Sequence, residues 1–195
     1  PKGKFTEKLE GLISFALCEN EFLQNIKSIL NCFDFEADFF CQDLCEALYL
    51  VSPEQRDGCA ILCDSGFLST SVSTVMGDGL IGLKSFSLGT GQIIADFCEA
   101  FEIDAQQAKE LLNNVSLLDK QDEIFEIETD DETKQIESGQ IYEIVECRAK
   151  QLARMIDKCL SYNKDLPKFL PVMLTGDGIC KIDGVLEIFK EELNR

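Results

Sequence analysis

Residues 59–88 constrain the fold most, because their pattern predicts three consecutive β-strands separated by tight turns. Cys59 to Cys63 is a continuous apolar run, typical of a strand buried on both faces. A turn at Asp64-Ser65-Gly66 leads to Thr70–Met76, where small polar and apolar residues alternate. Gly77-Asp78-Gly79 is a strong hairpin turn before a returning strand at Leu80–Leu88. We therefore predict a three-stranded meander.

The residues before the meander predict a β-α-β-α order. Strands are expected at Leu9–Cys18 and Glu36–Cys41. Helices are expected at Glu19–Cys32, with Asn20 as its cap, and at Gln42–Val51, ending before Pro53.

The residues after the meander alternate between helices and short strands. Helices are expected from Gly91, from Asp104 as a cap, from Ser138 and from Asp183. Residues 119–140 are acidic with one strand-like core, EIFEIE, which predicts a solvated insert. Phe169–Leu174 is expected to be a buried strand leading into Thr175-Gly176-Asp177-Gly178. The whole pattern predicts an α/β fold.

Charge and composition exclude several classes of function. The net charge is -18 with no histidine, so the surface repels nucleic-acid backbones and anionic lipid headgroups. We expect no nucleic-acid partner and no direct membrane contact by this segment. No apolar run approaches the roughly 20 residues of a membrane-spanning helix, and the first residues do not resemble a signal peptide.

Ten cysteines raise the question of a metal site or disulfides. There is no C-x-x-C pair and no histidine, so the usual zinc signatures are absent from the sequence. Free cysteine behaves as a small buried hydrophobe. We expect mostly buried, reduced thiols in a cytoplasmic protein.

Two glycine-containing loops carry the functional hypothesis. The loop Asp64 to Thr70 combines a carboxylate, a glycine and hydroxyls after a buried strand, which suits a nucleotide with Mg²⁺. Thr175 to Gly178 is a second loop where backbone can approach a ligand before a helix. Ordinary turn chemistry also explains both loops.

The order of these motifs resembles the FtsA family of bacterial cell-division proteins, within the actin, Hsp70 and MreB-like ATPase superfamily. The Asp64 loop stands where that family carries its second phosphate loop. MLTGDGICKIDG stands where it carries the adenosine loop, and SFSLGTGQIIADFCEAFEIDAQQAKELL resembles the segment between them. The upstream stretch ENEFLQNIKSIL to CDSG is similar to the helix, strand and interdomain helix that lead into the second half of that fold.

The resemblance implies a fold of two ribonuclease-H-like halves with ATP clamped between them. Residues 1–56 would belong to the end of the first half and residues 57–195 to the second half, with a small inserted subdomain around residues 119–146. The first phosphate loop of that family has no counterpart here. The resemblance assigns nucleotide contacts to Asp64, Gly66, Ser69, Thr70, Gly89, Gly91, Gly176, Asp177 and Gly178, with Asp64 holding Mg²⁺ through water.

Several positions depart from the family pattern. Phe67 and Leu68 replace two loop glycines, and Ser71 replaces the final loop aspartate. Lys109 and Leu112 replace the expected glutamate and lysine. Asp177 replaces a glycine, and its carboxylate would oppose a phosphate. We therefore expect a degenerate nucleotide site, with no catalytic residue, no bound cofactor and no ATP hydrolysis by this stretch alone.

The resemblance implies a cytoplasmic scaffold of cell division that self-associates and recruits the tubulin-like protein FtsZ. Membrane association would come from regions outside this chain, because IDGVLEIFKEELNR is too acidic for an amphipathic anchor. ATP and Mg²⁺ are implied ligands of a full-length protein. The alternative is an active actin-fold ATPase, of the pilus-assembly or chaperone type, whose site a missing first half completes.

Overall fold

The computed structural model describes residues 5, 7–8, 11, 13–129, 132–162 and 169–193. Helices in this part are α1 (Asn20–Asn31), α2 (Gln42–Leu50), α3 (Pro53–Asp57), α4 (Thr90–Phe101), α5 (Ala105–Asn113), α6 (Ser138–Ser161) and α7 (Val185–Glu192), with a 3-10 turn η1 (Ile179–Lys181). Strands are β1 (Ala60–Ser65), β2 (Thr70–Met76), β3 (Gly79–Phe86), β4 (Ile124–Glu128), β5 (Thr133–Glu137) and β6 (Val172–Thr175).

The meander forms as predicted and gains a fourth strand. The sheet order is β3-β2-β1-β6, in which β1 pairs antiparallel with β2 and parallel with β6. The sheet is therefore mixed, and both faces of its central strands are covered. This explains why β1 is a continuous apolar run rather than an alternating one.

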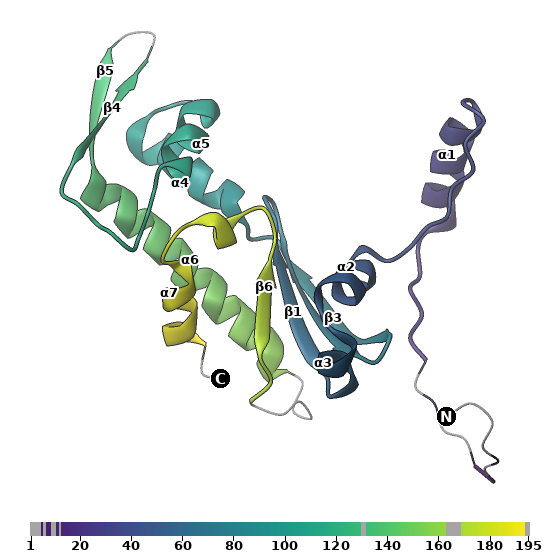
Figure 1. Ribbon diagram of the computed structural model, residues 1–195. Coiled ribbons are helices and arrows are strands. Elements are labelled where there is room, and N and C mark those ends of the chain that lie inside the picture. Colours follow the sequence, from purple (N-terminus) through teal and green to yellow (C-terminus); the bar gives the residue numbers. More distant parts are fainter. Residues whose placement is uncertain are drawn as a thin grey trace.

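The core lies on the two faces of this sheet, and successive residues of β1 serve opposite faces. Ile61 and Cys63 join the large cluster under α4 and α6, whereas Leu62 packs with Ala47 of α2 and with Val75. Figure 1 shows α4 and α6 on one side of the sheet and α2 and α3 on the other. The period-2 alternation of a strand produces this division.

Helix α2 ends before Pro53, as predicted. A further helix, α3, which was not predicted, begins at Pro53. This residue is the first residue of α3, where proline lacks only an N–H that would be unpaired anyway. Ser52 caps the helix through a capping box with Gln55. Arg56 then donates to the Asp78 carboxylate at 2.8 Å, so α3 is fastened to the turn between β2 and β3.

The acidic insert is a β-hairpin. The predicted strand-like core is β4, and its partner β5 was not predicted because TKQIE has a single apolar residue. The two strands pair antiparallel from Ile124↔Glu137 to Glu128↔Thr133. Figure 1 shows the hairpin projecting from the body at the start of α6.

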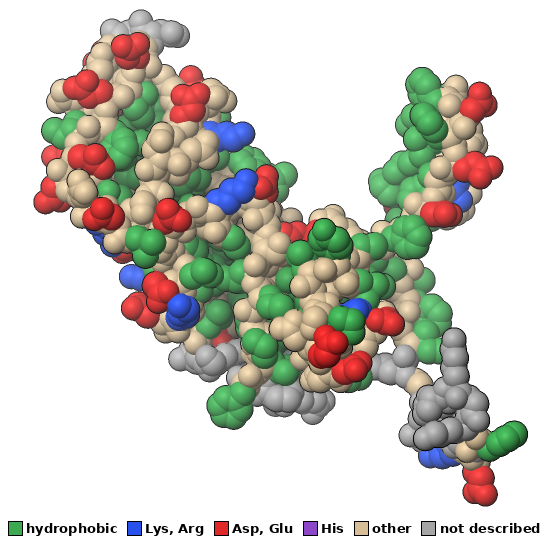
Figure 2. All heavy atoms as spheres, viewed as in Figure 1, with side chains coloured by type: hydrophobic (Ala, Val, Ile, Leu, Met, Phe, Trp, Pro, Cys, Tyr) green, Lys and Arg blue, Asp and Glu red, His purple; other side chains and the backbone are tan. Residues whose placement is uncertain are grey.

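The region before α2 differs most from the prediction. Helix α1 forms, but its cap residue is Glu19, without a side-chain cap, and not Asn20. Residues 13–18 and 36–41 are not in β-strands, since within the described residues they pair with no other strand; Leu9, Glu10 and Leu12 lie outside the described residues. No residue of α1 is buried, and Figures 1 and 2 show α1 standing apart from the body with apolar side chains on the side that faces it.

The cysteines are less buried than predicted. Of the ten, only Cys63 is buried, whereas Cys18, Cys32, Cys45 and Cys147 are exposed. Cys18 and Cys32 flank α1, a helix with no buried residue. Both thiols are therefore exposed although their neighbours in the sequence are apolar. Cys59 has a positive φ of 79° and precedes β1 instead of belonging to it.

Figure 2 shows acidic side chains spread over the whole visible face, as the net charge requires. Among the described residues, no helix has both the length and the apolar character needed to cross a membrane.

The core predicts very different sensitivities for two phenylalanines. Phe97 of α4 is fully buried with its ring centroid 5.6 Å from that of Phe101, whereas Phe22 of α1 is 54% exposed. We expect Phe97→Ala to lower the free energy of unfolding by about 3–5 kcal/mol. Phe22→Ala should change it by about 0.5 kcal/mol or less. Urea denaturation followed by circular dichroism measures both, and equal effects would contradict this account of the core.

Candidate functional site

The parallel pairing of β1 with β6 brings the two glycine-containing loops to one end of the sheet. Asp64 lies opposite Thr175 in the ladder, so the loop after β1 and the loop after β6 begin side by side. Asp64 and Gly176 therefore lie at neighbouring strand ends, as the actin-like fold implied by the order of the motifs requires. The start of α4 completes the cluster, because the Thr90 N–H donates to the Gly66 carbonyl at 3.2 Å.

Contact between the loops explains why glycine occupies several of these positions. A Cβ on Gly176, whose φ is 111°, would lie 2.2 Å from the Ser65 carbonyl oxygen. A Cβ on Gly89 would lie 2.4 Å from the Gly66 oxygen, and one on Gly178 would lie 2.9 Å from the same atom. These distances are shorter than any van der Waals contact. The glycines let three backbone segments touch one another.

Hydrogen bonds within the protein occupy several backbone N–H groups where the loops meet α4. The Gly66 N–H donates to the Ser69 carbonyl at 2.9 Å, and the Gly91 N–H donates to the Phe67 carbonyl at 2.8 Å. The Gly89 N–H donates to the Gln92 side chain at 2.7 Å. As arranged, the loop after β1 caps the N-terminus of α4 with its own carbonyl groups, in the place where an anion would bind.

The two predicted hydroxyl groups have different surroundings. Thr70 is fully buried, and its Oγ1 donates to the Leu88 carbonyl at 2.7 Å, so this hydroxyl supports the loop instead of facing a ligand. Ser69 is exposed at the loop tip. Only the second hydroxyl is placed to meet a ligand.

A cavity of about 610 Å³ lies beside the loops. It is lined by Phe67, Thr90, Ile94, Lys109, Leu112, Asn113, Val115, Asp177, Gly178, Lys181 and Ile182. The Phe67 ring lies against the start of α4, with its nearest carbon 3.0 Å from the position of a Cβ on Gly91. An aromatic side chain therefore lines the cavity beside the start of α4, at the position where the resemblance implies a loop glycine.

The charge at Asp177 differs from the sequence interpretation. Asp177 forms an ion pair with Lys181, four residues later, and Lys181 together with Lys109 holds the pKa of the Asp177 carboxyl below its usual range. The carboxylate is therefore compensated rather than left to repel an anion. Two lysines and one carboxylate give the mouth of the cavity a net positive charge within an acidic protein.

Asp64 has an acidic neighbour that the sequence did not reveal. Burial raises the pKa of the Asp64 carboxyl, and the nearby carboxylate of Asp43 raises it further. Asp43 lies in the first turn of α2, so the chain before β1 reaches the site. No group of three or more Asp, Glu, His or Cys within the described residues is arranged to hold a metal ion. Mg²⁺ would depend on Asp64, water and the ligand's own oxygens.

Some lining residues carried a sequence signal and others did not. The i, i+4 spacing of Asp177 and Lys181 is the sequence signal that fits their ion pair. Nothing in the sequence marks Asp43 or Asn113, because only the packing of α2 and α5 brings these residues to the loops.

Comparison with known proteins finds solved structures with a similar fold. The sequence matches no protein-family model and no curated protein. MreB5 of Spiroplasma citri bound to ADP matches with a TM-score of 0.73 and 12% identity, over 89% of this chain and 58% of that one. The ethanolamine utilization protein EutJ from Carboxydothermus hydrogenoformans matches with a TM-score of 0.57 and 16% identity, over 78% and 46%. A PilM-PilN type IV pilus biogenesis complex matches with a TM-score of 0.60 and 16% identity, over 80% of this chain and 40% of that one.

These likenesses concern the fold, because every identity is low. The chain spans about half the length of the structures that it matches. It therefore has an actin-like ATPase fold, as predicted, with a mixed sheet and flanking helices. Specific membership of the FtsA family is not shown.

The contact between the loops predicts a large cost for a single methyl group. Gly176→Ala combines a disfavoured φ with a clash against the Ser65 carbonyl, so we expect a loss of about 1–3 kcal/mol in the free energy of unfolding. Gly139→Ala is the matched control, because nothing lies within 4 Å of its Cβ and the residue is in a helix. Chemical denaturation compares them, and a Gly176→Ala variant as stable as Gly139→Ala would show that the loops do not touch.

Because the pKa of Asp64 is raised, replacing this residue with asparagine is expected to raise the thermal stability of the protein in a pH-dependent way. A carboxyl whose pKa is higher in the folded state stabilises the protein below its unfolded pKa and loses that contribution as pH rises through the folded pKa. Asp64→Asn should therefore raise the melting temperature at pH 7. The gain should vanish near about pH 3, where the carboxyl is mostly protonated in both states.

Asp122→Asn removes the same charge from an exposed position and serves as the control. Thermal melts at both pH values decide the matter. If Asp64→Asn and Asp122→Asn raise the melting temperature at pH 7 by the same amount, the change in net charge alone explains the effect.

Proposed function

We propose that this chain is part of an FtsA-like scaffold of bacterial cell division, with an actin-like fold whose nucleotide site is degenerate. The observation that carries the proposal is the closure of the phosphate end. Hydrogen bonds to neighbouring loop carbonyls occupy the N–H groups of Gly66, Thr90 and Gly91, so a polyphosphate would have to displace them. A site that satisfies its own donors gains little by exchanging them for a ligand.

The side chains at the loop tip support the same conclusion. Phe67 is 54% exposed and Leu68 is 68% exposed, where a phosphate-binding loop needs approachable backbone. Exposed apolar side chains on a loop favour contact with another protein surface over contact with a hydrated phosphate.

The proposed role carries further assignments. Residues 1–56 would close the first half of the fold and residues 57–195 would form the second half, with the β4–β5 hairpin as the inserted subdomain. The protein would act in the cytoplasm, self-associate and contact an FtsZ-like division protein. Membrane attachment would use regions outside this chain. The EutJ and PilM likenesses are to proteins of other named processes, so these partners rest on the sequence resemblance.

A second candidate is an active actin-fold ATPase completed by another half. One observation favours it: Lys109 and Lys181 compensate the Asp177 carboxylate, so the cavity mouth attracts anions. Adenine nucleotide and Mg²⁺ would then be held between this wall and an opposite one, with Asp64 as the carboxylate nearest the metal.

Titration of nucleotide separates the two candidates. We expect no measurable binding of ATP to the purified chain at micromolar nucleotide, with or without Mg²⁺, and no hydrolysis. Loss of two charge-assisted contacts weakens binding by about two to four orders of magnitude. Isothermal titration calorimetry measures this directly.

MreB5 of Spiroplasma citri, which was solved with ADP bound, is a positive control under the same conditions. A dissociation constant in the micromolar range or tighter for our chain would favour the ATPase candidate and end the degenerate-site proposal.

A further inference from the structure

A second hollow of the body lies between the inserted hairpin and α5, the helix that also borders the cavity beside the loops. It is a groove of about 320 Å³. One wall is α5, through Gln107, Glu110, Leu111 and Asn114, and the other is β4, through residues 125–128. The four helix residues have i, i+3, i+4, i+7 spacing, so one face of α5 lines the groove along its length.

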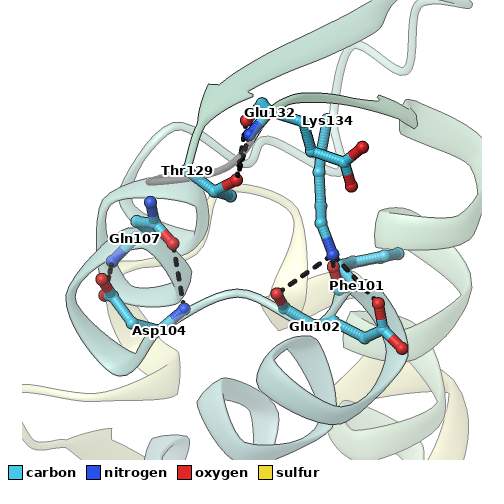
Figure 3. A network of polar contacts seen from close by, with 7 residues as sticks. All are labelled: Phe101, Glu102, Asp104, Gln107, Thr129, Glu132 and Lys134. Atoms are coloured by element: carbon cyan, nitrogen blue, oxygen red, sulfur yellow. Dashed lines mark hydrogen bonds and ion pairs between the residues drawn. The ribbon is translucent and has the colours of Figure 1, made fainter.

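Polar contacts fix the width of this groove. Lys134 of β5 donates to the carbonyls of Phe101 and Glu102, at 3.1 and 3.2 Å, and to the Glu102 carboxylate. Gln107 bridges the two walls directly, because its Nε2 donates to the Glu128 carbonyl at 2.6 Å. Figure 3 shows the contacts of Lys134 with Phe101 and Glu102, and beside them Asp104 and Gln107 at the start of α5. The hairpin is therefore held against α5, and the groove is closed at the Gln107 end.

The wall formed by β4 is the edge of a sheet. Strand β4 pairs with β5 alone within the described residues, so no strand lies along its other edge, although the Glu128 carbonyl of β4 accepts the hydrogen bond from Gln107. Such an edge is a template for one more strand. A groove between an edge strand and a helix accepts an extended peptide, whose main chain pairs with the strand while alternate side chains enter the groove.

The lining of the groove defines the chemistry of the peptide. Leu111 is buried, and Phe125 and Ile127 are half-buried, so these three side chains form an apolar floor. Glu110, Glu126 and Glu128 form the rim, and no lysine or arginine pairs with them in the described part of the chain. Glu110 and Glu126 accept hydrogen bonds only from neutral glutamine amides. Rim carboxylates around an apolar floor match alternating basic and apolar residues.

We propose that this groove binds an extended basic segment of a partner protein, which adds a strand to the free edge of β4. The groove shares no lining residue with the cavity beside the loops, although α5 borders both. The net charge of -18 draws a cationic segment toward the molecule, and the floor and strand edge select where it binds.

A fluorescein-labelled peptide of four Lys-Val repeats probes the groove by fluorescence anisotropy with the full chain. We expect binding of this peptide, no binding of the matching Glu-Val peptide, and at least a tenfold loss for a Lys-Pro peptide, which cannot donate ladder hydrogen bonds. Hydrogen exchange of residues 124–128 should slow when the Lys-Val peptide binds.

Two variants locate the binding. Glu110→Lys with Glu126→Lys should weaken the Lys-Val peptide by about tenfold, since two attractions become repulsions. Glu143→Lys with Glu99→Lys makes the same change in net charge at exposed positions outside the groove, and should weaken it about twofold or less. The proposal would be overturned if the Lys-Val peptide did not bind, or if both double variants weakened its binding equally. It would also be overturned if the Lys-Pro peptide bound with the same affinity, or if hydrogen exchange of β4 did not change.

Discussion

The structure depends on the parallel pairing of β1 with β6. About 110 residues separate the two strands, yet the ladder from Ile61↔Val172 to Asp64↔Thr175 sets them side by side. Parallel strands cannot be joined by a tight turn, so everything between them must be folded as a crossover. The helices α4 and α6 fill that crossover and bury the large core. Without this pairing neither the core nor the meeting of the loops would exist.

The glycine-containing loops after β1 and β6 meet in close backbone contact. The family resemblance implies that the glycines at 89, 176 and 178 let a nucleotide approach the backbone. In the structure, these glycines let the backbone segments of the loops approach one another. Carbonyls of the loop after β1 cap α4, and the Phe67 ring stands beside Gly91. The same contacts that make this end of the sheet compact would also oppose a phosphate at the proposed degenerate site.

The prediction from sequence succeeded where local pattern and burial agree. Strands β1, β2 and β3 and helices α4 to α6 follow from apolar periodicity, hairpin glycines and the cap at Asp104. It failed at residues 13–18 and 36–41, because a strand forms only when a neighbour supplies hydrogen bonds, and the described chain supplies none there. It also failed for most cysteines, because an apolar neighbourhood in sequence does not ensure burial.

The sequence by itself determined the α/β class, the meander, the actin-like order of motifs and the presence of Phe67 in the loop after β1. These follow from local patterns of residues and from their order along the chain. Only the tertiary structure decided that Thr70 is buried, that Lys109 and Lys181 compensate Asp177, that Asp43 faces Asp64 and that β4 with α5 forms a groove. These depend on how separate elements pack, since burial and charge neighbours are properties of distances that no local pattern encodes.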